Sequence, residues 1–190
     1  MGEVFVLVEH RQGKIRDITY EMLGAGENVA SQQGGSSTAV LLGHNVKNFA
    51  EELATRASKV LVVEDGNLEH FNSIHYQKVL SSLVTKYQPL LTLIGHTAFG
   101  MDLAPSLSVE MGFPLVTDCI GLSFEESRLK ALRSIYGGKV NATVSLRESK
   151  GYIATIRPGV FSPKMSAEKK AGIIIAVSYT HLTLPTKRIV

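Results

Sequence analysis

The turn Gly95-His96-Thr97-Ala98-Phe99-Gly100 is the segment of this 190-residue chain best suited to bind a ligand. It follows an apolar run and opens a helical pattern, so its backbone N–H groups can bind an anion at the edge where open α/β sheets bind their ligands. The alternative is an ordinary tight turn, which Asp102 favours because a carboxylate then lies near the positive end of the helix. The candidate anion- or nucleotide-binding residues are Gly95, His96, Thr97 and Gly100.

Other segments that could carry chemistry give no catalytic or metal site. The sequence contains neither a G-x-G-x-x-G nor a G-x-x-x-x-G-K-[ST] loop, and Gly34-Gly35-Ser36-Ser37 precedes a strand instead of following one. Cys119 is the single cysteine and has apolar neighbours, which favours a small core residue over a reactive thiol. His70 and His75 are five residues apart, a spacing that does not align them on one helical face. We expect no catalytic residue and no metal site in this chain.

Strand-like and helix-like patterns alternate along the first 117 residues. Continuous apolar runs predict strands at residues 4–8, 39–42, 59–63, 90–94 and 115–117. Helical patterns lie between them at 17–29, 49–56, 74–87 and 99–111. This alternation predicts an α/β fold with a doubly wound, mainly parallel sheet and helices on both faces.

The pattern changes after Asp118, where residues 120–157 lack a helical period. Three strand-like runs with turn signals between them predict an antiparallel strand meander, with strands at 133–136, 142–146 and 152–156. Residues 1–177 are expected to form one α/β domain. The last thirteen residues, 178–190, contain no acidic residue and do not continue the preceding strand, so we interpret them as a non-native tail.

Composition excludes several classes of partner. Hydrophobic residues make up 44% and charged residues 19% of the chain, as in ordinary globular proteins. Without Lys187 and Arg188 in the tail, the chain has 18 basic and 17 acidic residues, and a net charge of +1 is too small to indicate a nucleic-acid-binding surface. No apolar run approaches the roughly 20 residues of a membrane span. No signal or transit peptide is visible at the N-terminus, so we expect an intracellular protein without membrane insertion.

Five motifs stand in order along the chain: Val4-Phe5-Val6-Leu7-Val8-Glu9, Gly95-His96-Thr97-Ala98-Phe99-Gly100-Met101-Asp102-Leu103-Ala104-Pro105, Leu115-Val116-Thr117-Asp118, Arg133-Ser134-Ile135-Tyr136-Gly137-Gly138-Lys139-Val140, and Ile156-Arg157-Pro158-Gly159-Val160-Phe161. With these motifs the chain resembles, over essentially residues 1–165, the N-terminal domain of the electron transfer flavoprotein α subunit. The family pattern most often has Gly-Asn after the tyrosine, whereas Gly138-Lys139 stands here and Asn141 follows. Each motif is weak alone, but together and in order they are specific.

The resemblance implies a heterodimeric electron carrier. An α subunit pairs with a β subunit, and the complex carries electrons from acyl-CoA or other dehydrogenases to a quinone reductase or another acceptor. FAD belongs mainly to the C-terminal domain of the α subunit, for which this sequence has no counterpart, and AMP belongs to the β subunit. We therefore expect a scaffold domain that binds no FAD tightly and is not catalytic alone. It would act in the bacterial cytoplasm, or in the mitochondrial matrix of a eukaryote.

Two further expectations concern binding surfaces. Four of the eight arginines lie in or beside the predicted meander, namely Arg128, Arg133, Arg147 and Arg157. Arginine is enriched at protein interfaces, so the outward face with Arg133 and Tyr136 is a candidate docking surface for the β subunit or for the C-terminal domain; the alternative is a solvated face. The alternative function is a free-standing adenine-nucleotide-binding domain, with AMP or ATP over Gly95–Gly100.

Overall fold

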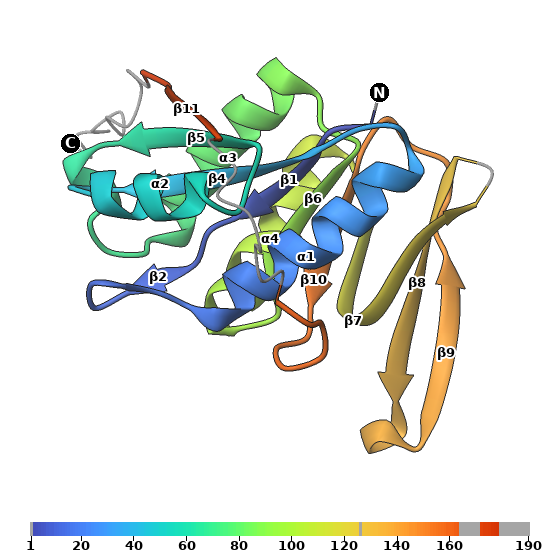
Figure 1. Ribbon diagram of the computed structural model, residues 1–190. Helices are drawn as coiled ribbons and strands as arrows, with labels where there is room; N and C mark the ends of the chain where they lie inside the picture. The colour runs from blue at the N-terminus through green and yellow to red at the C-terminus, as the bar shows by residue number, and fades with distance from the viewer. Residues whose placement is uncertain (1, 126, 164–171, 179–190) are drawn as a thin grey trace, which may run out of the picture.

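The parallel sheet forms the centre of the computed structural model, which describes residues 2–125, 127–163 and 172–178. Nine strands lie in the order β11-β5-β4-β1-β6-β10-β7-β8-β9 (Figure 1). Their bounds are β1 Val4–Leu7, β4 Ser37–Gly43, β5 Lys59–Glu64, β6 Leu91–Gly95, β7 Leu115–Glu125, β8 Arg128–Ile135, β9 Val140–Ser145, β10 Tyr152–Ile156 and β11 Ile173–Ala176. A separate two-stranded hairpin consists of β2 (His10–Arg11) and β3 (Lys14–Ile15).

Helices cover both faces of the sheet, as the sequence predicted. The helices are α1 (Asp17–Gln32), α2 (Lys47–Ala54), α3 (Ser73–Tyr87) and α4 (Ala98–Met111), with short 3₁₀ turns η1 (Gly66–Leu68) and η2 (Tyr136–Gly138). In β1, Val4 and Val6 pack on the face that α1 and α2 cover, whereas Phe5 packs on the face of α3 and α4. Since both faces of the strand are buried, every residue of β1 must be apolar, which explains the continuous apolar run.

The predicted position of one strand is wrong. Residues 152–156 were expected in the antiparallel meander, but β10 lies inside the parallel sheet, where it pairs in parallel with β6 and with β7. All five of its residues are buried, which a parallel strand covered on both faces requires and a half-exposed meander strand does not. The turn signal at Ser149–Gly151 returns the chain to the central sheet instead of closing a hairpin.

The antiparallel meander consists of β7, β8 and β9. β7 extends from Leu115 to Glu125, far beyond the predicted run 115–117, so its first part belongs to the parallel sheet and its second part to the meander. β8 and β9 project away from the rest of the domain (Figure 1). Residues 179–190 of the predicted non-native tail lie outside the described residues. None of the described helices combines the length and the apolar character needed to cross a membrane.

Candidate functional site

A β-bulge at Asp118 is the starting point of the site. Ala154 of β10 pairs with Val116, while Ile156 pairs with Cys119, so β7 contains one more residue than the segment of β10 beside it. The backbone makes room for the extra residue at Asp118, whose φ of +60° is a left-handed conformation that aspartate tolerates better than most residues. Its backbone N–H donates to the Thr155 hydroxyl at 2.9 Å, which fixes the bulge against β10.

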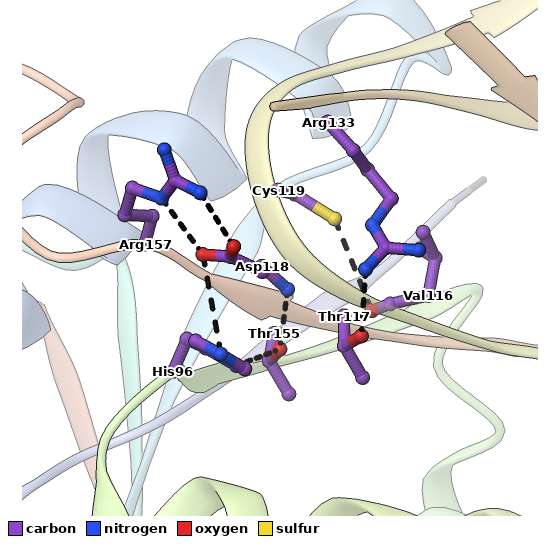
Figure 2. Close-up of polar contacts among 8 residues, drawn as sticks. All are labelled: His96, Val116, Thr117, Asp118, Cys119, Arg133, Thr155 and Arg157. Atoms are coloured by element: carbon purple, nitrogen blue, oxygen red, sulfur yellow. Dashed lines mark hydrogen bonds and ion pairs between the residues drawn. The ribbon is translucent and has the colours of Figure 1, made fainter. Parts of the chain in front are cut away.

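Arg157 follows β10 directly and binds the carboxylate of Asp118. Its Nε donates to Oδ1 at 2.8 Å and its Nη2 to Oδ2 at 2.5 Å, a bidentate pair (Figure 2). These hydrogen bonds hold the pKa of Asp118 below its ordinary value, against the opposing effect of partial burial. The backbone N–H of Arg157 also donates to the Cys119 carbonyl at 3.0 Å. Backbone and side-chain contacts therefore join the end of β10 to the bulge of β7.

His96 reaches the same carboxylate from the end of β6. Its Nδ1 lies 2.9 Å from the Thr155 hydroxyl, and its Nε2 lies 4.0 Å from Oδ1 of Asp118. The backbone N–H of His96 donates to the Ile156 carbonyl at 2.7 Å. The Thr155 hydroxyl thus bridges the imidazole of His96 and the backbone of Asp118 (Figure 2).

Arg133 approaches the bulge from β8, where it pairs with Cys119 across the antiparallel ladder. Its Nη2 donates to the Thr117 hydroxyl at 3.3 Å, and its Nε is buried without a hydrogen-bond partner among the described residues. The side chain is half-buried, whereas Tyr136, in the turn after β8, is 77% exposed. The two residues predicted for one docking face therefore differ: Tyr136 lies on the surface, and Arg133 packs against the bulge.

Cys119 is a core residue, as the sequence predicted. Its side chain is fully buried, and its Sγ lies 3.8 Å from the Val116 carbonyl oxygen. Burial raises the pKa of the Cys119 thiol to about 12. The thiol therefore stays protonated at neutral pH and is a poor nucleophile.

The turn Gly95–Gly100 is closed by a carboxylate of the chain itself. Thr97 caps the N-terminus of α4: its hydroxyl accepts the N–H of Gly100 at 3.4 Å and donates to Oε2 of Glu9 at 2.8 Å. Glu9 is 9% exposed and follows β1, so the carboxylate beside the turn is that of Glu9, while Asp102 is exposed. A β-carbon at Gly100 would lie 1.8 Å from the Gly95 carbonyl oxygen, which shows how closely the turn is packed. Of the four candidate residues, His96 is the one that reaches Thr155 and Asp118.

His96, Asp118, Arg133 and Arg157 come from four separate segments of the sequence, the same four that follow Gly95 in the resemblance. Sequence reasoning named these segments but did not predict that they meet. The available signal was that His96, Asp118 and Arg157 stand just after the predicted strands 90–94, 115–117 and 152–156; that these strands are neighbours was not predicted. We call these four residues the Asp118 cluster.

The charges of the Asp118 cluster determine what it can do. Two guanidinium groups and an imidazole surround one carboxylate, so the cluster carries net positive charge and can attract an anionic group or an acidic protein surface. The described residues contain no group of three or more His, Cys, Asp or Glu side chains that could hold a metal ion. The hydroxyl next to the His96 imidazole is that of Thr155, which is fully buried and also accepts the backbone N–H of Asp118. This contact holds the bulge together and leaves the hydroxyl closed to a substrate, so the geometry suits binding better than covalent catalysis.

Comparison with known proteins agrees with the fold and the motifs. The family model described as "Electron transfer flavoprotein domain" matches residues 4–181. The electron transfer flavoprotein subunit alpha of Clostridium acetobutylicum is 37% identical over 161 residues, which cover 83% of this chain and 48% of that protein. The corresponding subunit of Thermoanaerobacterium thermosaccharolyticum is 32% identical over 175 residues, covering 91% and 53%. That of Bacillus subtilis is 33% identical over 194 aligned positions, covering 100% and 59%.

The chain spans about half the length of the curated relatives it matches. The matched half contains all the segments that form the Asp118 cluster, since the family model includes residues 96 through 157. The extent of this match and the identity to several α subunits carry the same conclusion: the chain belongs to the electron transfer flavoprotein family.

Proposed function

We propose that this chain is the scaffold half of an electron transfer flavoprotein α subunit. It binds the β subunit and positions the remainder of the α chain, where FAD carries electrons from acyl-CoA or other dehydrogenases to a quinone reductase or another acceptor. The observation that carries the proposal is the convergence of the family's motifs on the Asp118 cluster, which offers positive charge in a fixed arrangement. The relatives that support it are bacterial, and we place the complex in the cytoplasm.

We infer that this half of the α subunit does not hold FAD. In doubly wound α/β folds, the pyrophosphate of a dinucleotide binds to free backbone N–H groups at a glycine-rich turn after a strand. After β1 the chain forms the hairpin β2–β3, and the turn after β6 is closed by Glu9. We therefore propose that FAD is held by the other half of the α subunit, and AMP by the β subunit. The alternative, AMP or ATP over Gly95–Gly100, has less support because a phosphate there would meet the carboxylate of Glu9.

Flavin content tests the scaffold role. The purified 190-residue chain, mixed with excess FAD and passed through a desalting column, is expected to show no flavin absorption bands. The full-length α subunit with its β subunit is expected to retain one FAD. Stoichiometric FAD on the 190-residue chain alone would overturn the proposal.

We further propose that the tip of the β8–β9 hairpin docks the β subunit. β9 ends the sheet and pairs only with β8 among the described strands, so one side of its backbone is open for contact. Tyr136, Val140 and Val144 are exposed along this hairpin, with fractional exposures of 77%, 48% and 37%. An exposed aromatic side chain flanked by apolar residues is a common anchor of protein interfaces. Arg133, two residues before the end of β8, binds the Thr117 hydroxyl and so joins the hairpin to β7.

Substitution at the hairpin tip tests this docking surface. In a full-length α subunit, Tyr136→Ala is expected to weaken affinity for the β subunit at least tenfold, about 1.4 kcal/mol. Val109→Ala is the matched control, because Val109 on α4 is 84% exposed but lies outside the hairpin. Arg133→Ala is expected to lower affinity together with thermal stability. Unchanged affinity of Tyr136→Ala for the β subunit would reject this docking surface. Loss of FAD without loss of the β subunit would indicate that the surface contacts the C-terminal half of the α chain instead.

A further inference from the structure

A cavity of about 600 Å³ lies at the carboxyl edge of the sheet, beside the turn Gly95–Gly100 and separate from the Asp118 cluster. Its walls come from the segments that follow β1, β4, β5 and β6. After β1 the chain forms β4 and β5 on one side of that strand and then β6 on its other side. The direction in which successive strands are added to the sheet therefore reverses at β1. Open α/β sheets bind their ligands at this reversal. The volume falls within the roughly 300–1,000 Å³ typical of small-molecule sites.

Three phenylalanines give the cavity flat apolar walls. The rings of Phe71 and Phe99 stack at 4.2 Å between centroids with an interplanar angle of 3°. The ring centroids of Phe49 and His10 lie 5.3 Å apart. A hydrogen bond of 2.7 Å between Nε2 of His10 and the Leu42 carbonyl oxygen fixes the orientation of the imidazole. Such walls favour a planar aromatic ring, because aromatic faces bury large apolar area with defined geometry.

Two opposite charges lie among these walls. Arg11 is exposed on β2, and its guanidinium has no ion-pair or hydrogen-bond partner among the described residues. Glu69, in the segment after η1, is exposed and lines the same cavity. A guanidinium fork suits a phosphate or carboxylate, and a carboxylate accepts hydrogen bonds from ribose hydroxyls or an amino group. His44 adds an imidazole to the rim.

We propose that this cavity binds a nucleoside monophosphate, with its base against the phenylalanine walls, its phosphate at Arg11 and its hydroxyl groups at Glu69. The site lies next to the turn Gly95–Gly100 and shares only Phe99 with it, so the carboxylate of Glu9 does not block it. This binding goes beyond the scaffold role, since it needs neither the β subunit nor FAD.

Calorimetric titration of the 190-residue chain tests the site, with AMP, adenosine and inorganic phosphate as probes. AMP is expected to bind with a Kd below about 1 mM and at least tenfold more tightly than adenosine or phosphate alone. Arg11→Ala is expected to weaken AMP at least tenfold. Lys14→Ala is the matched control: Lys14 pairs with Arg11 across the hairpin and carries the same charge, but does not line the cavity. The affinity of Lys14→Ala for AMP is expected to stay within twofold of that of the wild type.

A variant that fills the cavity provides an independent readout. His44→Trp, at an exposed position of the rim, is expected to abolish AMP binding while the thermal unfolding midpoint stays unchanged. Three results would overturn the proposal: no saturable AMP binding, equal weakening by Arg11→Ala and Lys14→Ala, or phosphate binding as tight as AMP. The second would indicate general charge attraction, and the third would show that the aromatic walls contribute nothing.

Discussion

The guanidinium of Arg157 donates two hydrogen bonds to the carboxylate of Asp118, at 2.8 and 2.5 Å, and so fastens the bulge of β7 to the residue that follows β10. The pair spans 39 residues of sequence. It holds Asp118 at φ +60°, which leaves its carboxylate beside His96 and its backbone N–H on Thr155. The shape of the site therefore depends on this pair together with the backbone hydrogen bonds of Asp118 and Arg157.

Acid is expected to remove the stabilisation that this pair provides. Because Arg157 lowers the pKa of Asp118 in the folded chain, the folded state binds a proton there less readily than the unfolded chain. The contribution is present above the unfolded pKa of about 4 and is lost as the pH falls through the lower, folded pKa. The free energy of unfolding, measured with urea, should therefore be higher for the wild type than for Asp118→Asn at pH 7, and this difference should shrink toward pH 3.

Asp102→Asn is the control for that comparison, because Asp102 is exposed and no hydrogen bond or ion pair of its side chain lies among the described contacts. Its free energy of unfolding is expected to follow the wild type at every pH. A difference between wild type and Asp118→Asn that stays constant from pH 7 to pH 3 would contradict the role of the pair.

The single cysteine is expected to be inert in the folded chain. Burial raises the pKa of Cys119 to about 12, and no solvent reaches its side chain. Ellman's reagent at pH 8 should therefore modify it only as fast as the chain unfolds, and rapidly in concentrated urea. Immediate reaction with the folded chain would mean that the bulge opens readily.

The parallel core could be predicted from the sequence because its signal is local. A strand buried on both faces must be apolar at consecutive positions, and β1, β4, β5 and β6 each show this in their own residues. The place of β10 could not be predicted in the same way. Its five residues are equally buried and mostly apolar, but the strands beside it, β6 and β7, lie 37 to 61 residues away in sequence.

The candidate site was predicted only in its parts. The sequence indicated the turn Gly95–Gly100, but the carboxylate that closes this turn belongs to Glu9, 88 residues before Thr97. The bulge at Asp118 appears only when β7 is aligned with β10. Arg133 was predicted to lie on an outward face of the meander, whereas its guanidinium donates to Thr117 of β7. Each of these features depends on long-range pairing, which residue patterns do not report.

Removing the charge of Glu21 is expected to loosen the segment after β10. Glu21 of α1 is 7% exposed, and its carboxylate accepts hydrogen bonds from the backbone N–H groups of Gly159, Val160 and Phe161 at 2.9 to 3.3 Å. Glu21→Gln places an amide where only acceptors fit, so the free energy of unfolding should fall by about 1–3 kcal/mol. Urea denaturation measures the loss, and amide hydrogen exchange should accelerate at residues 159–161.

Glu51→Gln on α2 is the control for the loss of a glutamate charge, because Glu51 is exposed. Its stability is expected to remain within about 0.5 kcal/mol of the wild type. If Glu21→Gln were equally mild and exchange at 159–161 did not change, the carboxylate would not be what holds this segment.

Adding one methyl group at Gly100 is expected to disturb the start of α4. A β-carbon there would lie 1.8 Å from the Gly95 carbonyl oxygen and 2.9 Å from the Ile94 side chain, and a backbone oxygen cannot move aside without shifting the turn. Gly100→Ala should lower the free energy of unfolding by at least about 2 kcal/mol. Gly66→Ala is the matched control, since no atom lies within 4 Å of the β-carbon built there and its φ is not positive.

The same pair of variants separates stability from local geometry. If the turn shifts to admit the methyl group, the hydrogen bond from Thr97 to Glu9 should break, because Thr97 lies between Gly95 and Gly100 in that turn. His96 would move with it, and the chemical shifts of its imidazole should change in Gly100→Ala but not in Gly66→Ala. An unchanged His96 signal, together with wild-type stability, would mean that the turn tolerates a side chain and that close packing is not why glycine occupies position 100.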